Sequence, residues 1–525
     1  MSKTTKRKVI LVLTAIMLIL SSLNLTAFAS ISSSTTGSIT VENLEPGVTA
    51  YLYQLTTVNV NDSSSQPQDP TYYWVEAVQD WIATNYPDFI DTDDGSVTTA
   101  FNNEDYTDYS TDVTTFYSEL IAAIKGGEIS LSYTSSQTTS GTASYPVDED
   151  SCTESVTFSS LAMGTYLVLV ENGYRVYTPV VANLTPEYDE DSSAWVLNDV
   201  TAECKSTTPS ITKYFTDTSL TADNYSSVDT ISYTIVADIP TYEADSLSTT
   251  YEISDSVDGG LTVDTTSITV YGVSGTSETV LVEDTAYTLS YNGIVYTFSF
   301  DYDEISSYEQ IKITYNASLT AGGVDALTTG KAGNGNTATL TYSNNPYVAS
   351  STQSQDTDEV QVYTYGIEIT KVDSSDTSVT LEGAEFTLSD SNGNTLSFVK
   401  DEDSGIYYLS ESSDASTTLT SNSDGTITIK GLDEGTYTLK ETKAPDDYSI
   451  NSTTVEITIE DADLDGLLDY DEADDNGIYE ITFSDVAAFS LPLTGGMGTV
   501  LFTLFGVLIV VLGIALLSKS KKNKK

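Results

Sequence analysis

Short stretches in which apolar and polar residues alternate recur along most of the 525-residue chain. Thr266–Tyr271 and Gly425–Lys430 are typical, because every second side chain in their middle is Ile or Val. A period of two places one set of side chains in a core and the other in water, as in the strands of antiparallel sheets. The pattern predicts an all-β fold built of β-sandwiches in tandem.

Apolar residues at helical spacing occur mainly in two segments, Tyr73–Thr84 and Thr111–Ile124. The first segment carries several apolar residues on one side: Trp74, Val75, Val78, Trp81 and Ile82. Such a stripe could bind a ligand, but a helix packed on a sheet is the commoner use of this pattern. We therefore predict some helix in the N-terminal part of the chain, packed against a sheet.

The N-terminus carries the pattern of a secretion signal. Four basic residues precede an apolar stretch from Val9 to Leu20, and Ala27-Phe28-Ala29 has the small-x-small form of a cleavage site. These features predict a signal peptide over residues 1–29 and a secreted mature chain.

The C-terminus carries a second apolar run, from Thr499 to Leu517, followed by five lysines within residues 519–525. About 19 residues at ~1.5 Å each can cross a bilayer core of roughly 30 Å, with the lysines on the cytoplasmic side. Ahead of the run stand Leu491, Pro492, Leu493, Thr494 and Gly495.

This pentapeptide resembles the LPxTG sorting signal of Gram-positive surface proteins, which sortase cuts between Thr and Gly. The resemblance implies that residues 491–525 form a sorting signal with a transmembrane helix and a basic tail. It also implies covalent attachment to peptidoglycan, with the membrane involved only for the precursor. A plain membrane anchor would explain the apolar run and the lysines but not the pentapeptide.

The charge of the chain excludes several function classes. It has 77 acidic and 20 basic residues, no histidine, and a formal net charge of -57. Such a chain repels nucleic acid and other polyanions. Without histidine, Ser-His-Asp catalysis and histidine metal sites are impossible. A glycosidase with paired carboxylates remains formally open, but no spacing singles out a pair, so we predict no enzyme.

Two stretches with linker-like composition, Ser206–Ser210 and Ser350–Asp358, divide the mature chain. The predicted domains comprise residues 30–208, 209–360 and 361–490. A strand-like segment with one lysine follows each linker: Lys213 lies in Ile211–Phe215, and Lys371 lies in Ile367–Val372.

The third domain carries the most specific internal motif. Tyr437–Tyr448 reads YTLKETKAPDDY and resembles the E-box YxLxETxAPxGY of CnaB-type, SpaA-like domains, with Asp447 in place of glycine. In that family a lysine of the first strand and an Asn or Asp of the last strand form an isopeptide bond, assisted by the E-box glutamate. The resemblance implies Lys371 as the amine, Glu441 as the acid and Asp485 as the acceptor.

Burial is what this chemistry requires. An exposed lysine with a pKa of about 10.4 is charged and unreactive, whereas an apolar site lowers that pKa and raises those of carboxyl groups. A protonated glutamate can then polarise the acceptor carbonyl and move protons. A buried lysine and carboxylate that form only an ion pair are the alternative. An Asp acceptor releases water, where an Asn acceptor releases ammonia.

The second domain resembles the Ig-like, CnaA-type domain that forms an isopeptide bond in fimbrial backbone subunits. The resemblance implies Lys213 as the amine, Asp255 as the acid and Asn336 as the acceptor. Asn336 shares a strand face with the apolar residues that follow it, so its amide would point inward. Asn334 has the same parity and is the second candidate, and a turn asparagine beside glycine is the alternative. The first domain should lack such a bond, because no lysine lies between residues 30 and 124.

A further lysine would make the protein a polymer subunit. Backbone pilins carry a motif WxxxVxVYPK, whose lysine is joined by sortase to the threonine of another subunit. The stretch from Trp195 to Lys205 keeps the tryptophan, a valine and the lysine, but it is one residue longer and lacks the Tyr-Pro pair. The resemblance implies Lys205 as the linkage lysine; an ordinary exposed lysine, with Lys125 as the other candidate, is the alternative.

Cys152 and Cys204 are the only cysteines. In an oxidising extracellular setting, two cysteines in one domain favour a disulfide, which would fix the segment beside Lys205. Two buried thiols are the alternative.

An acidic stretch of the third domain, Asp461–Glu472, matches the EF-hand calcium loop at positions 1, 3, 5, 6, 9 and 12. The candidate ligands are Asp461, Asp463, Asp465, the Leu467 carbonyl, Asp469 and Glu472. Gly466 would supply the sharp turn. We therefore predict a possible calcium site, although chance aspartate clusters are common in so acidic a chain.

Together these resemblances identify the sequence as similar to a major pilin, the repeated shaft subunit of a sortase-assembled pilus on a Gram-positive cell wall. They imply pilus-type and housekeeping sortases, further copies of the same chain, minor pilins and peptidoglycan as partners. The alternative is a monomeric wall-anchored adhesin that binds a host or partner-cell ligand and needs Thr494 but not Lys205.

Overall fold

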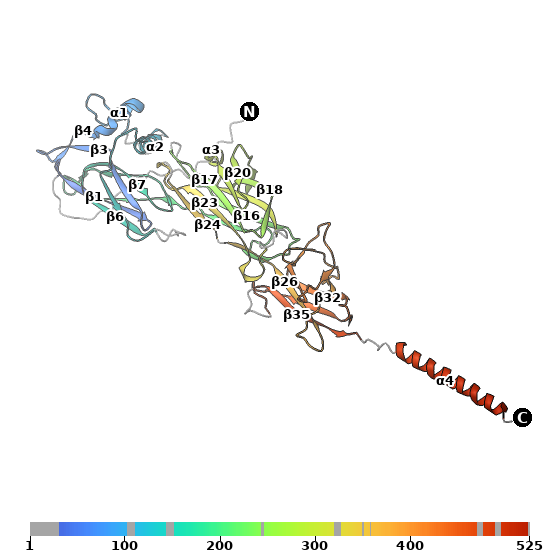
Figure 1. Ribbon diagram of the computed structural model, residues 1–525. Helices are drawn as coiled ribbons and strands as arrows, with labels where there is room; N and C mark the ends of the chain where they lie inside the picture. Colours follow the sequence, from blue (N-terminus) through green and yellow to red (C-terminus); the bar gives the residue numbers. More distant parts are fainter. Residues whose placement is uncertain are drawn as a thin grey trace.

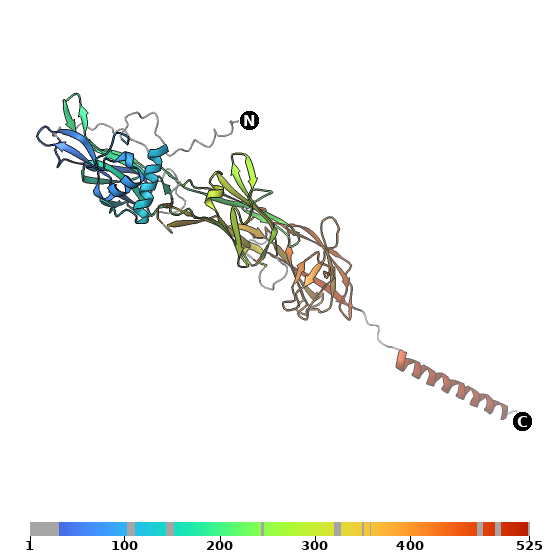
Figure 2. The same cartoon turned by 90° about the horizontal axis from the view of Figure 1, so that it is seen from above.

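Three β-rich bodies lie in a row and a long helix follows them, as two perpendicular views of the computed structural model show (Figures 1 and 2). The structure describes residues 31–101, 111–142, 152–242, 246–319, 327–348, 351–357, 359–469, 476–488 and 495–522. Strands dominate each body, so the predicted all-β fold is confirmed. The signal peptide falls outside the described residues.

The first body, domain 1, places two helices beside two main sheets. Its elements are β1 (Thr36–Leu44), β2 (Thr49–Gln54), β3 (Thr56–Asn61), β4 (Gln66–Trp74), α1 (Glu76–Asn85), η1 (Pro87–Phe89), α2 (Thr111–Gly126), β5 (Ser135–Thr138), β6 (Glu154–Ala162), β7 (Gly164–Glu171), β8 (Val176–Tyr177), β9 (Val180–Leu184), β10 (Glu187–Asp189), β11 (Ala194–Val196), β12 (Val200–Glu203) and β13 (Ser206–Thr207). The main sheets have the orders β12-β1-β6 and β5-β2-β7-β9. The first strand β1 and the late strand β12 pair in parallel.

The two helices match the predicted segments, except that α1 begins later than expected. Residues up to Trp74 pair with β3 instead, because the strand β4 runs directly into the helix. Val78 and Ile82 of α1 and Phe116 of α2 are buried in one cluster with Leu167 of β7. The apolar stripe is therefore packing surface between helix and sheet, as predicted.

Domain 2 is a sandwich of two larger sheets. Its elements are β14 (Ile211–Phe215), β15 (Ala222–Asn224), β16 (Ile231–Asp238), β17 (Tyr251–Val257), β18 (Leu261–Ser274), β19 (Ser277–Val280), β20 (Tyr287–Tyr291), β21 (Val295–Phe300), α3 (Tyr302–Ile305), β22 (Gln310–Leu319), η3 (Gly330–Ala332), β23 (Asn334–Ser343), β24 (Thr352–Asp356) and β25 (Val360–Tyr363). One sheet has the order β14-β16-β22-β18-β19, and the other has β15-β25-β23-β17-β21-β20 with β24 also on β23. The first strand β14 and the late strand β23 thus lie in opposite sheets.

The stretch Ser350–Asp358 differs from the expected linker. Strand β24 lies within it and pairs with β23, while β25 follows and continues the same sheet. Its polar composition suits an edge strand, whose outer side faces water, so composition alone did not separate it from a linker. Domain 3 begins after Thr364.

Domain 3 is a smaller sandwich. Its elements are β26 (Tyr365–Asp373), β27 (Glu385–Ser389), β28 (Phe398–Lys400), β29 (Tyr407–Leu409), β30 (Leu419–Thr420), β31 (Thr426–Leu432), β32 (Gly435–Lys443), β33 (Tyr448–Ser449), β34 (Thr454–Ile459) and β35 (Ile478–Ala487). The sheets have the orders β28-β29-β31-β26-β35-β33 and β30-β27-β32-β34. Here the first and last strands, β26 and β35, are parallel neighbours in one sheet.

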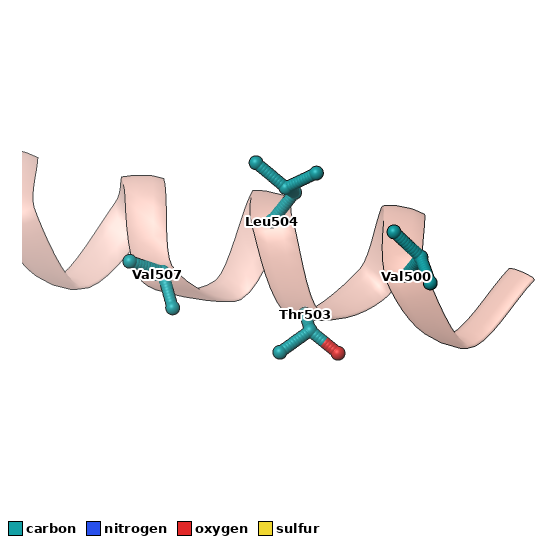
Figure 3. A pocket seen from close by; sticks show the side chains of 4 residues that line it. All are labelled: Val500, Thr503, Leu504 and Val507. Atoms are coloured by element: carbon teal, nitrogen blue, oxygen red, sulfur yellow. The ribbon is translucent and has the colours of Figure 1, made fainter. Parts of the chain in front are cut away.

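Helix α4 (Gly495–Lys522) covers the C-terminal apolar run and stands apart from the three domains (Figure 1). Val500, Thr503, Leu504 and Val507 line a hollow on this helix (Figure 3). Among the residues that the structure describes, no helix is long and apolar enough to cross a membrane. The transmembrane assignment of residues 499–517 stays a prediction.

Candidate functional site

Lys213 on β14 points into the core of domain 2, and its side chain is fully buried. Its ammonium contacts Oδ1 of Asp255 on β17 and Oδ1 of Asn336 on β23. Asp255 and Asn336 are 1% and 0% exposed. The structure thus brings together the three residues that the sequence singled out in this domain, and the contact crosses from one sheet to the other.

Two tyrosines that sequence reasoning missed complete this site. The Tyr315 hydroxyl donates to Oδ2 of Asp255 and accepts a hydrogen bond from Nδ2 of Asn336 at 2.8 Å. The Lys213 ammonium lies 5.2 Å from the ring centre of Tyr233 and 5.6 Å from that of Tyr315. The available sequence signal was the alternation of apolar and polar residues along β22, which points Tyr315 inward.

Burial changes the protonation of the amine. Desolvation lowers the pKa of Lys213 to about 8, against the opposing effect of the Asp255 charge. A far larger fraction of this amine is neutral near pH 7 than in an exposed lysine. Asn334, the second candidate acceptor, is directed elsewhere, since its amide group bonds the backbone of Thr328 and Val362.

Domain 3 holds a second buried lysine. The Lys371 ammonium on β26 lies 3.0 Å from Oε1 of Glu441 and also contacts Oδ1 of Asp485. All three side chains are 0% exposed. Burial raises the pKa of the Glu441 carboxyl, although the backbone N–H of Asn451 donates to it at 2.7 Å. The residues implied by the E-box resemblance are therefore close enough to react.

Local backbone geometry explains the arrangement in domain 3. In the parallel register Lys371 pairs with Phe483, so Asp485 lies two residues beyond on the same strand face. The rings of Phe483 and Phe386 lie 4.7 Å and 5.8 Å from the ammonium and keep the site apolar. Asp447, which replaces the glycine of the motif, keeps a left-handed backbone with φ 68, a conformation that Asp tolerates.

Lys205 differs from both buried lysines, because its side chain is exposed. Its backbone is held in place: the Thr178 N–H donates to the Lys205 carbonyl at 2.9 Å. The Arg175 guanidinium donates to Oγ and to the carbonyl of Ser206 at 2.7 and 3.1 Å. By contrast, the ammonium of Lys125 forms an ion pair with Glu171 at 2.5 Å.

Trp195, at the other end of the motif-like stretch, lies on the hairpin of β10 and β11. Trp195 belongs to β11, and its ring packs edge-on against Tyr188 of β10 with centroids 5.7 Å apart. The tryptophan therefore packs within its own hairpin, before the chain enters β12.

No bond joins Cys152 and Cys204 in the structure, and the disulfide between them stays a prediction. Cys204 follows β12 and is buried, which raises the pKa of its thiol to about 12. A buried, protonated thiol is a poor nucleophile for disulfide formation.

The acidic loop of domain 3 gathers three of the predicted calcium ligands. Carboxylate oxygens of Asp461, Asp463 and Asp469 lie within 4.8 Å of one another. The Asp461 carboxylate also accepts the backbone N–H groups of Asp465 and Gly466 at 3.2 and 2.8 Å. Neighbouring negative charges, chiefly Asp465, raise the pKa of Asp463.

The remaining predicted residues are less constrained. The Asp465 carboxylate accepts the N–H of Leu467 at 2.9 Å, and so caps the turn. Glu472 and the sorting residues 491–494 lie outside the described residues, whereas Gly495 begins helix α4.

Two family descriptions match the C-terminal half of the chain. Residues 365–473 match the SpaA prealbumin-like fold domain, and residues 484–525 match the LPXTG cell wall anchor motif. The predicted SpaA-like domain and cell-wall anchor are thereby confirmed.

Known proteins resemble a larger part of the chain. The trypsin-resistant surface T6 protein of Streptococcus pyogenes serotype M6 is 27% identical over 334 residues, covering 58% of this chain and 57% of that relative. The matched region therefore spans less than two thirds of the relative's length.

Solved structures share the fold. The T6 backbone pilin of S. pyogenes has a TM-score of 0.57 at 24% identity, covering 82% of this chain and 81% of that one. The major pilin SpaD of Corynebacterium diphtheriae has a TM-score of 0.51 at 19% identity, covering 88% and 100%. The predicted resemblance is confirmed: the chain is similar to sortase-assembled major pilins of Gram-positive bacteria, and it ends in their type of cell-wall anchor.

Proposed function

We propose that the protein is the shaft subunit of a covalently polymerised pilus, in which sortase joins Thr494 of one copy to Lys205 of the next. The observation that carries this proposal is the contrast between Lys205 and the other lysines that the sequence singled out. Lys213 and Lys371 are buried, and Lys125 is paired, but Lys205 presents an exposed amine on a fixed backbone at the end of domain 1. The similarity to backbone pilins supports the same role.

The two buried centres would each form an intramolecular isopeptide bond without an enzyme. In domain 2 the neutral Nζ of Lys213 attacks Cγ of Asn336, the new C–N bond replaces the C–Nδ2 bond, and ammonia leaves. In domain 3 Nζ of Lys371 attacks Cγ of Asp485, and water leaves. Low exposure, apolar rings and the lowered pKa of Lys213 support this chemistry.

Polymer formation on cells tests the role of Lys205. The gene is expressed with its pilus-type sortase, and wall extracts are separated under denaturing conditions. We expect a ladder of high-mass species for the wild type, and single wall-linked chains for Lys205→Arg. The matched control Lys331→Arg changes an exposed lysine of domain 2 and should keep the ladder. A persisting ladder in Lys205→Arg would overturn the linkage assignment.

The same experiment separates the proposed function from a monomeric adhesin. A monomeric adhesin predicts wall-linked single chains for the wild type as well, because it needs only the cut at Thr494. Thr494→Ala should abolish wall attachment under both readings, so it serves as the control for anchoring.

A further inference from the structure

The Tyr315 hydroxyl bridges the acid and the acceptor of the domain 2 centre. It donates to Oδ2 of Asp255, and Nδ2 of Asn336 donates to it at 2.8 Å. The other carboxylate oxygen of Asp255 contacts Lys213. Each oxygen of Asp255 thus serves a different partner, and Tyr315 links the carboxyl group to the amide nitrogen.

This link answers a chemical requirement of the reaction. An amide nitrogen departs only after it gains a proton, and the attacking lysine nitrogen must lose protons at the same time. In domain 3 the Lys371 ammonium contacts both the acid and the acceptor, since it lies 3.0 Å from Glu441 and also contacts Asp485. In domain 2 the described contacts of Asp255 reach Lys213 directly but reach the leaving nitrogen of Asn336 through Tyr315.

We propose that Tyr315 is a catalytic residue that carries a proton from Asp255 to the leaving nitrogen of Asn336, an inference that rests on the proposed Lys213–Asn336 bond. Asp255 takes a proton from the Lys213 ammonium, and the neutral Nζ attacks Cγ of Asn336. Tyr315 then gives its hydroxyl proton to Nδ2 and regains one from Asp255, so the phenol stays neutral.

The atoms balance without a further reactant. The Nζ–Cγ bond forms, the Cγ–Nδ2 bond breaks, and Nδ2 leaves as ammonia. The second proton shed by Nζ passes to Asp255, and ammonia removes it as ammonium. No group is oxidised or reduced, and the carboxylate of Asp255 is regenerated.

The packing of Tyr315 suits this role. Its ring is stacked on that of Tyr233, with centroids 5.3 Å apart and an interplanar angle of 24°. The residue is 3% exposed and lies on β22 in the middle of the sheet. A ring held this firmly keeps the hydroxyl between its two partners.

The rate of bond formation tests the proposal. The full-length chain is made by cell-free translation, the reaction is stopped at intervals in acid, and the tryptic peptide joining Lys213 and Asn336 is quantified by mass spectrometry. We expect Tyr315→Phe to slow its appearance about a hundredfold or more, the usual range for losing a proton-transfer group. Equal rates for Tyr315→Phe and the wild type would overturn the proposal.

Tyr251→Phe is the matched control. Tyr251 is another buried tyrosine of domain 2, but its hydroxyl bonds the backbone carbonyls of Ala237 and Asp238 at 3.2 and 3.1 Å. This variant should form the bond at the wild-type rate. If the wild type itself forms no bond, the proposed isopeptide chemistry fails, which is a different outcome from a Tyr315→Phe variant that is as fast as the wild type.

A fluorinated tyrosine at position 315 covers the case in which Tyr315→Phe does not fold. Fluorination keeps the shape of the ring but makes the hydroxyl more acidic. Proton transfer through the hydroxyl predicts a rate that changes with this acidity, whereas a purely structural role predicts an unchanged rate and would refute the proposal.

Discussion

The Lys371 ammonium lies against the Asp485 carboxylate across two parallel strands, and both side chains are completely shielded from solvent. The comparable pair in domain 2, Lys213 and Asn336, instead spans two sheets. Each lysine nevertheless reaches an acceptor on a late strand of its own domain. Two different sandwiches therefore bring a lysine of the first strand to an Asn or Asp of a late strand.

The domain 3 pair predicts an unusual result for Asp485→Asn. This variant should lose ammonia, about 17 Da, where the wild type loses water, about 18 Da, because the amide replaces the acid as leaving group. The two cross-linked products are then the same molecule, and their intact masses should be identical. Asp485→Ala should give no cross-linked peptide.

Glu441→Gln tests the role of the acid in that reaction. It keeps the shape of the side chain but removes the carboxyl proton, so bond formation should be strongly reduced. A cross-linked Lys371–Asp485 peptide at wild-type yield in Glu441→Gln would show that the glutamate has no role.

The domain 2 bond predicts a large effect on stability. It would close a loop with a sequence separation of 123 residues between Lys213 and Asn336. By chain entropy such a closure stabilises a domain by about 4–5 kcal/mol, or roughly 10–20 °C in melting temperature. Asn336→Ala should lose this amount in calorimetry.

Asn334→Ala is the matched control for that measurement. Asn334 is equally buried on the same strand, but its amide group bonds the backbone and does not contact Lys213. It should keep the cross-link and lose only the effect of its own hydrogen bonds. A larger loss for Asn334→Ala than for Asn336→Ala would argue against a covalent bond at Asn336.

Domain 1 should lose stability as the pH rises above the ordinary pKa of glutamate. Glu45 is 0% exposed, and burial raises the pKa of its carboxyl group although the Arg175 N–H donates to it at 3.0 Å. The folded state therefore favours the protonated acid. The stability that this raised pKa contributes to domain 1 is complete below pH about 4.5 and is lost as the pH rises through the higher pKa of the folded state.

Calorimetry of Glu45→Gln between pH 4 and 8 checks this dependence. The variant should show a smaller decline of the domain 1 transition with pH than the wild type. Each unit of pKa shift corresponds to about 1.4 kcal/mol, or roughly 3–6 °C for a domain of this size. Parallel curves for the two proteins would mean that Glu45 does not titrate between these limits.

The acidic loop predicts calcium binding, which we propose from the convergence of Asp461, Asp463 and Asp469. Calcium should raise the melting temperature of domain 3 at millimolar concentrations, because it offsets the repulsion among these carboxylates. Asp463→Asn combined with Asp469→Asn should remove the effect.

Asp376→Asn is the control for calcium binding, because Asp376 is an exposed turn aspartate of the same domain that caps Ser378. It should leave the calcium response unchanged. The calcium site would be contradicted if the melting curve of the wild type were the same in calcium, in magnesium and in EDTA.

Much of the fold could be predicted from the sequence because its strands alternate cleanly. Lys213 and Lys371 stood out as lone basic residues on apolar strand faces, where a charge needs a special reason. Glu441 came from a motif, and Asn336 from its parity with inward apolar residues. These signals are local, so each can be recognised without knowing which strand lies opposite.

The rest depended on contacts between distant segments. Tyr315 lies on an inward face, but only the approach of β17 and β23 places its hydroxyl between Asp255 and Asn336. In the sequence, strand β24 resembles a linker, because the hydrogen bonds that make it a strand come from the distant strand β23. The disulfide stays a prediction for the same reason, because two cysteines in one domain say nothing about how closely their segments approach.

The exposed position of Lys205, shortly before Lys213, has a mechanical consequence. In a filament joined through Lys205 and Thr494, a pulling force would enter at the end of domain 1 and leave after domain 3. It would pass through the Lys213–Asn336 and Lys371–Asp485 cross-links and bypass the part of domain 1 that precedes Lys205. That part of domain 1 would lie outside the path of the pulling force, so changes in its loops and helices would not weaken the fibre.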